Sequence, residues 1–136
     1  MQTIANFFQH YTEAYVNADT QAFGQFISLP CMLLAGDSKT LLMDEDSLHN
    51  HILSQVEKSR QLGVVDAEPI LQHQLRLSEQ LHFVSLYWRF FDASTKVLFT
   101  CHTSYTLQKC QQQWKVVAII LDDEQAAYNR VAGIQA

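Results

Sequence analysis

Side chains that could carry out chemistry are few in this sequence and are spread along its length. Six of them are predicted to lie on or near the face of a sheet that lines a cavity. Tyr11 and Tyr15 come from the first predicted helix, and the others come from the predicted sheet: His73, Thr103, Tyr105 and Asp122. An imidazole with a pKa near ~6.5 can act as a general base, and a carboxyl group in an apolar cavity can act as an acid. His73 and Asp122 are therefore the predicted catalytic pair, with a tyrosine as hydrogen-bond donor. The alternative is structural: His73 is a core histidine with one hydrogen bond, and Asp122 caps a final helix.

A second group of residues is suited to line a pocket. These predicted ligand-binding residues are aromatic or carry a hydroxyl: Tyr11, Tyr15, Trp88, Thr103 and Tyr105. Such a lining selects a small, mostly apolar ligand by size rather than by chemical class. In the alternative, large side chains fill the interior and the tyrosine hydroxyls bind backbone carbonyls.

The histidines do not predict a metal site. His49 and His51 lie two positions apart on a predicted helix, so they point roughly 200° apart, whereas an i, i+4 pair is needed. His82 and His102 fall on opposite faces of the predicted sheet. His10 has a single acidic residue nearby, Glu13, and His73 has none within four positions, so neither has enough ligands in its neighbourhood and no metal is expected.

The cysteines and glycines likewise suggest no cofactor. Cys31, Cys101 and Cys110 show no Cys-x-x-Cys spacing, which favours free thiols in a reducing compartment. The four glycines form no phosphate-binding loop, and no serine lies in a nucleophile elbow.

Composition predicts one soluble globular domain over residues 1–136, because 48% hydrophobic and 17% charged residues supply enough apolar material for a core. The net charge is −5 and the basic residues are scattered, so nucleic acid is not an expected partner. No apolar run approaches the ~18 residues of a membrane span, and the N-terminus lacks signal-peptide features. We expect a cytoplasmic protein.

The N-terminal region predicts two helices that meet at a corner. Apolar residues recur every three or four positions at Ile4, Phe7, Phe8, Tyr11, Tyr15 and Ala18. This spacing predicts an amphipathic helix over residues 2–18. Asp19 can then cap a second, short helix that stops at Leu29-Pro30. The inward residues of that helix are Phe23, Phe26 and Ile27.

A hairpin and a third helix follow. Residues 31–35 and 39–43 are short apolar strands around a turn-forming Gly36-Asp37-Ser38. Asp44 is the expected N-cap of the third helix, and Gly63 is its stop signal.

From Val64 onward the hydrophobic period is two, which predicts a four-strand antiparallel meander. Two-residue turns at 79–80, 93–94 and 111–112 fix three registers. These registers place three pairs opposite each other: His73 and Leu86, Tyr87 and Thr100, and Tyr105 and Ala118.

One face of this meander is the richer in apolar residues and should take the helices. It carries Trp88, Thr103, Tyr105, Ala118 and Ile120, among others. The opposite face is polar at one side and apolar at the other, which suggests a partner sheet. The apolar positions of that partner surface are Leu98, Val117, Ile119 and Leu121.

The chain resembles the nuclear transport factor 2-like (NTF2-like) superfamily, also called SnoaL-like or ketosteroid-isomerase-like. Residues 8–15 leading to 17–23, and the strand Trp114-Lys115-Val116-Val117, carry the resemblance over nearly the whole chain. It implies an α+β cystatin/NTF2-like cone, with three N-terminal helices in the concave face of a curved, mostly antiparallel sheet. It also implies a homodimer formed through the convex face. This superfold hosts enzymes and non-enzymatic subunits alike.

Catalytic residues of the ketosteroid isomerases are largely absent from the matching positions. Their base falls here on Ala35 or Leu34, and their protonated aspartate on Thr100 or Thr103, whereas Tyr11 matches their tyrosine. The resemblance therefore does not imply their proton-abstraction mechanism.

Three functions follow from these observations. The leading one is a homodimer that binds a small, mostly apolar molecule in the cone cavity. The first alternative is a SnoaL-like hydratase, isomerase or hydrolase that uses His73 and Asp122. The second is a protein-interaction module or scaffold with a filled cavity.

Overall fold

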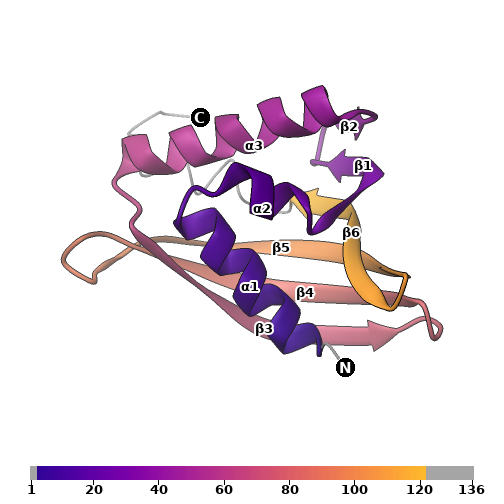
Figure 1. The fold of residues 1–136 in the computed structure, drawn as a ribbon. Helices are drawn as coiled ribbons and strands as arrows, with labels where there is room; N and C mark the ends of the chain where they lie inside the picture. The colour runs from indigo at the N-terminus through magenta and orange to yellow at the C-terminus, as the bar shows by residue number, and fades with distance from the viewer. Residues whose placement is uncertain (1–2, 122–136) are drawn as a thin grey trace.

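The computed structural model describes residues 3–121. Its helices are α1 (Ile4–Val16), α2 (Thr20–Gly24) and α3 (Glu45–Leu62). Its strands are β1 (Ile27–Leu34), β2 (Lys39–Leu42), β3 (Asp66–Arg76), β4 (Leu81–Phe91), β5 (Val97–Cys110) and β6 (Gln113–Leu121). The helices lie on the same side of a curved sheet, which confirms the predicted α+β cone (Figure 1).

The sheet has six strands in the order β2-β1-β6-β5-β4-β3. The predicted meander is confirmed as β3 to β6, and every neighbouring pair is antiparallel except β1 and β6, which run parallel. The β1–β2 hairpin thus extends the sheet beyond its last strand in sequence.

Capping residues define the helix ends where the sequence predicted them. The side chain of Asp19 accepts a hydrogen bond from the Ala22 amide, and Asp44 forms a capping box with Ser47. Gly63 ends α3 with φ +86°, a left-handed conformation that glycine adopts without strain.

Replacing Asp44 by Ala should lower the melting temperature by about 3 °C, because the Ser47 amide loses its acceptor. Asp44→Asn should cost far less, since Asn caps equally well. Hydrogen bonds from Ser47 lower the pKa of Asp44, so its stabilisation is present above the ordinary carboxyl pKa. It disappears as the pH falls through the lowered pKa. Thermal melts at neutral and acidic pH test this; equal losses in both variants would show that the hydrogen-bond geometry is not responsible.

The predicted second helix is too long. It ends at Gly24, and Ile27 begins β1 because Ile27 pairs with Val116 while the Val116 amide binds the Phe26 carbonyl at 2.8 Å. Pro30 lies inside β1 after a cis peptide bond. The strand tolerates Pro30 because this position falls in gaps of both neighbouring ladders, so no backbone amide is required there.

Between β4 and β5 the predicted register is wrong but the faces are right. Tyr87 lies opposite His102, two positions beyond the expected Thr100. One position comes from a wider loop, in which the Asp92 carboxylate accepts hydrogen bonds from the Ser94 and Lys96 amides, and the other comes from Leu98, which has no partner in β4. From Phe99 onward the shift is by two, which leaves those side chains on their predicted faces.

Between β3 and β4 the prediction fails for His73. It lies opposite Ser85 rather than Leu86, because the turn is longer than two residues. A register shift between Leu71 and His73 then places Leu71, rather than His73, opposite Leu86. His73 is therefore exposed and shares the face of Ser85.

A bulge in β6 overturns the predicted faces of that strand. The two-residue turn is right, but Val117 has no partner in β5, so Tyr105 lies opposite Ile119 rather than Ala118. Ile119 and Leu121 consequently turn to the concave face, whereas Ala118 and Ile120 turn to the convex one. Their predicted positions were reversed.

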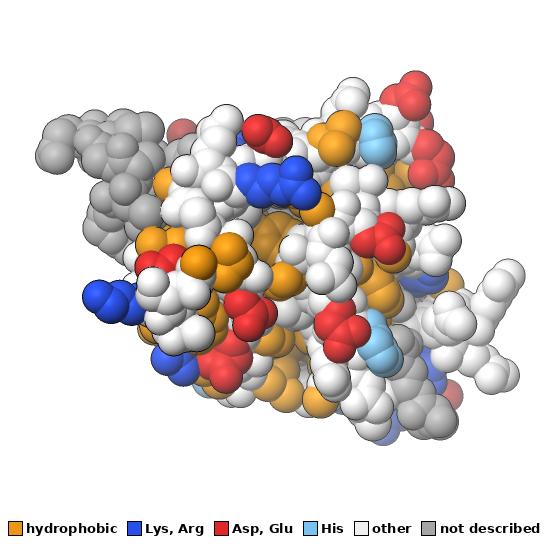
Figure 2. Space-filling view, turned by 60° about the vertical axis from the view of Figure 1, so that its left-hand side comes forward, with side chains coloured by type: hydrophobic (Ala, Val, Ile, Leu, Met, Phe, Trp, Pro, Cys, Tyr) orange, Lys and Arg blue, Asp and Glu red, His pale blue; other side chains and the backbone are white. Residues whose placement is uncertain are grey.

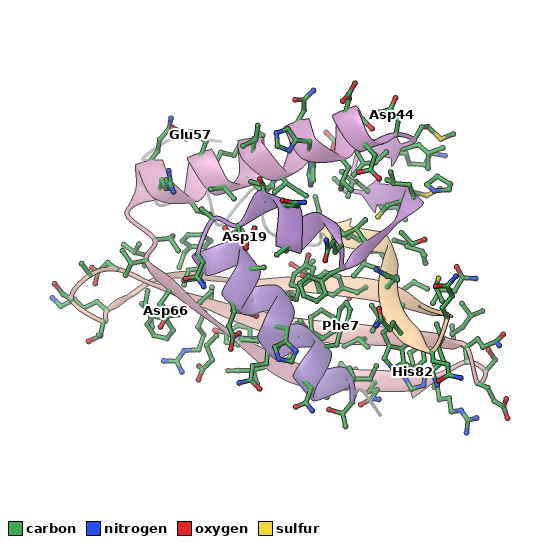
Figure 3. The ribbon with its side chains drawn as sticks, in the orientation of Figure 1. Phe7, Asp19, Asp44, Glu57, Asp66 and His82 are labelled. Atoms are coloured by element: carbon green, nitrogen blue, oxygen red, sulfur yellow. The ribbon has the colours of Figure 1, made fainter. Side chains whose placement is uncertain are left out.

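The core lies between the helices and the concave face. Phe7, on α1, has no exposed surface and points between α1 and the sheet (Figure 3). The other most completely buried side chains are Ile52, Leu86, Leu107, Val84, Val116, Cys31 and Cys101.

Candidate functional site

A cavity of about 70 Å³ lies between the three helices and strands β4, β5 and β6. Its aromatic lining is Tyr11, Tyr15, Phe23, Trp88, Phe90 and Tyr105. Its aliphatic lining is Ile27, Ile119 and Leu121. The β6 bulge thus turns two of these three side chains, Ile119 and Leu121, toward the cavity.

Contacts among the aromatic residues hold the wall in place. The Tyr11 ring lies 4.5 Å from that of Phe23 and 5.8 Å from that of Tyr105, measured between centroids. The Trp88 indole donates a hydrogen bond of 3.1 Å to the Tyr105 hydroxyl. Tyr15, on α1, hydrogen-bonds Ser59 on α3, which ties the two helices together above the cavity.

All five predicted ligand-binding residues line this cavity: Tyr11, Tyr15, Trp88, Thr103 and Tyr105. Two threonines, Thr100 and Thr103, match the position of the isomerase aspartate. Thr103 faces the cavity, whereas Thr100 pairs with Arg89 on the other face of the sheet. Their role in binding stays a prediction.

His51 and Gln55 supply polar groups from α3 that the sequence reasoning missed. Burial, and to a lesser extent the charge of Lys58, lower the pKa of His51, so its imidazole is neutral at neutral pH. A neutral imidazole can accept a hydrogen bond or a proton from a bound molecule. The sequence signal for this pair is the spacing of four between His51 and Gln55, beside the buried residues Leu48 and Ile52. The sequence reasoning considered His51 only as a metal ligand.

Of the predicted catalytic pair, the structure describes His73 alone. His73 lies on β3 outside the cavity lining, and Asp122 lies outside the described residues. The catalytic role predicted for His73 and Asp122 stays a prediction.

The predicted partner surface needs revision. Ile119 and Leu121 line the cavity, and Val117 and Leu98 are each left without a strand partner at a register shift, so none of the four predicted positions lies on the paired convex face. Half-buried apolar side chains on that face are Phe83, Tyr87 and Ile120.

A second, open groove lies between α1 and the start of β3. Its carboxylates are Glu13, Asp66, Glu68 and Asp92. Figure 2 brings this side forward and shows acidic side chains around apolar ones. Glu68 pairs with Arg89 at 2.9 Å, the Asp92 carboxylate accepts two backbone hydrogen bonds, and Glu13 and Asp66 are exposed.

The described residues contain no group of three His, Cys, Asp or Glu side chains that could hold a metal ion. Burial raises the pKa of the Cys31 thiol to about 11, so it is not a reactive thiolate. No helix within residues 3–121 is long and apolar enough to cross a membrane.

Three helices in the concave face of a curved six-stranded sheet, around an apolar cavity, define the NTF2-like class of α+β proteins. A family model described as "NTF2-like protein (DUF6841)" matches residues 2–124, and the chain belongs to this family. No curated protein matches the sequence significantly.

Solved structures share the fold at low sequence identity. An NTF2-like protein of unknown function from Shewanella oneidensis superposes with a TM-score of 0.69 at 13% identity, covering 88% of this chain and 96% of that one. Aln2 from a Streptomyces species gives 0.69 at 11%, covering 93% and 92%. A ketosteroid isomerase-like protein from Erwinia carotovora gives 0.65 at 18%, covering 88% and 92%.

Proposed function

We propose that this NTF2-like protein is a cytoplasmic homodimer that binds a compact, mostly apolar molecule in the cone cavity. The observation that carries the proposal is the cavity itself, with its aromatic and aliphatic wall and polar groups from α3 and β5. The apolar wall favours burial of hydrocarbon, and the neutral His51 and Gln55 offer hydrogen bonds to one polar group of the ligand.

The size of the cavity limits the ligand. A volume of about 70 Å³ exceeds the roughly 10–15 Å³ that one water requires, but it is below the roughly 150 Å³ of a cavity that binds benzene. The ligand therefore has a few non-hydrogen atoms, unless lining side chains move to admit more.

The convex face supports association between two copies of the chain. The convex-face side chains Phe83, Tyr87 and Ile120 are only half-buried within one chain, and a stable interface buries roughly 1,200–2,000 Å² in total. Light scattering on the purified protein tests this part of the proposal: a dimer supports it, and a monomer contradicts it.

Native mass spectrometry of the protein as purified from cells tests the cavity. The expected result is a bound small molecule at one per chain. Leu121→Trp, which fills the cavity, should lose it, whereas Ile120→Trp, next in sequence but on the other face, should retain it. A wild-type protein that never carries a ligand, or one that both variants retain equally, would contradict cavity binding.

A further inference from the structure

A hollow of about 540 Å³ lies at the opposite end of the sheet from the acidic groove, between the strand ends and the N-terminus of α1. Figure 3 shows His82 at this end and Asp66 at the other. The basic and aromatic side chains that line the hollow are Arg76, His82, Lys109 and Trp114, one each from β3, β4, β5 and β6.

Trp114 organises the side chains of this hollow, which we name the basic hollow. The Lys109 ammonium lies 5.2 Å from the centre of the Trp114 ring, a cation–π contact. The centre of the His82 ring lies 4.7 Å from that of the Trp114 ring, and the Gln74 amide contacts His82 Nδ1 at 3.4 Å. Through these contacts the Lys109 ammonium and the His82 imidazole both pack against the Trp114 ring.

Among the described residues, no carboxylate forms an ion pair with the basic side chains of the hollow. Burial lowers the pKa of His82, and the charges of Arg76 and Lys109 lower it further, so their fields overlap at the imidazole. Within residues 3–121 the one ion pair is that between Arg89 and Glu68. Glu79, in the β3–β4 turn, is the sole carboxylate among the residues lining the basic hollow, and it pairs with neither cation.

The N-terminus of α1 adds to the same field. Thr3 and Ile4 line the basic hollow, so the positive end of the dipole of this 13-residue helix opens onto it. The chain as a whole carries a net charge of −5, so a local surplus of positive charge at one end is a departure from its average.

We infer that the basic hollow binds the phosphate group of a small soluble molecule, with Arg76 and Lys109 as its charged ligands and His82 as a hydrogen-bonding partner. A guanidinium offers paired donors to a tetrahedral oxyanion, and an ammonium supplies a point charge beside it. A phosphate group carries about −1.5 to −2 charges near neutral pH, which matches the two fixed cations and the helix dipole. This site is separate from the cone cavity and does not depend on the function proposed for it.

NMR titration of the His82 imidazole with inorganic phosphate, against chloride at equal ionic strength, is the first test. Bound phosphate offsets the charges of Arg76 and Lys109, so the pKa of His82 should rise when phosphate is present. His82→Gln assigns the signal among the six histidines. A pKa unchanged by phosphate would overturn the inference.

Charge variants then distinguish a specific phosphate site from nonspecific electrostatic attraction. Arg76→Gln and Lys109→Gln should each raise the dissociation constant of phosphate about threefold, and Glu79→Gln should lower it by a similar factor. Lys96→Gln, in the β4–β5 loop, makes the same change in net charge outside the basic hollow and should have no effect. An equal loss in Lys96→Gln would overturn the inference.

Two further ligands identify the source of the phosphate. Glycerol 3-phosphate should bind at least as well as inorganic phosphate if a small soluble ester is the ligand. Vesicles containing phosphatidic acid should not bind; binding to vesicles without binding to the soluble ester would overturn the inference in favour of a membrane surface.

Discussion

Replacing Phe7 by Ala should lower the free energy of unfolding by about 3–5 kcal/mol, the largest loss we expect from any truncation in α1. The Phe7 side chain has no exposed surface, and its ring contacts those of Phe8 at 5.0 Å and Phe26 at 5.6 Å. Truncation removes these contacts and leaves a cavity that the rigid sheet below cannot fill. Urea denaturation followed by circular dichroism measures the loss.

Two variants of the same helix serve as controls for Phe7→Ala. Phe7→Leu keeps most of the volume and should cost much less, while Gln9→Ala, at an exposed position, should change stability by no more than about 0.5 kcal/mol. A loss in Phe7→Ala as small as that in Gln9→Ala would show that α1 does not pack on the sheet as described.

Ile119→Asp should lower the free energy of unfolding by about 4 kcal/mol, because it places a carboxylate in an apolar site with no cationic partner among the described residues. Ile119 is 7% exposed and lies opposite Tyr105 on the concave face. This result depends directly on the bulge at Val117, since without it Ile119 would face outward.

Ile120→Asp is the matched variant, one residue away on the convex face. It should cost about 1 kcal/mol within one chain and should shift the proposed dimer toward monomer. Denaturation at two protein concentrations separates association from folding. A larger loss in Ile120→Asp than in Ile119→Asp at both concentrations would show that the faces of β6 are reversed.

Helix positions were predictable because their signals are local. Asp19, Asp44 and Gly63 each act within one turn of their own position, and the structure uses all three as caps. The start of β1 was not predictable, because Ile27 follows the apolar spacing of α2 and is drawn into a strand by Val116, far away in sequence.

The faces of β6 could not be predicted from its sequence. Residues 116–121 are all apolar, so alternation carries no information about which side chains point inward. For β4 and β5, alternation survives a register error of two, which is why Trp88, Thr103 and Tyr105 were placed on the concave face correctly. His73 was misplaced because an error of one position reverses the face.

The parallel pairing of β1 with β6 has a consequence for how this chain folds. Its partners, such as Ile27 and Val116, are separated by about ninety residues, so the loop they close includes most of the protein. Long-range contacts of this kind slow folding, because the entropy of closing the loop is lost before the strand contacts form. During synthesis α1, α2 and the β1–β2 hairpin emerge well before β6, and β1 keeps an unpaired edge until β6 has been synthesised. A cell would need to shield that edge from other nascent chains.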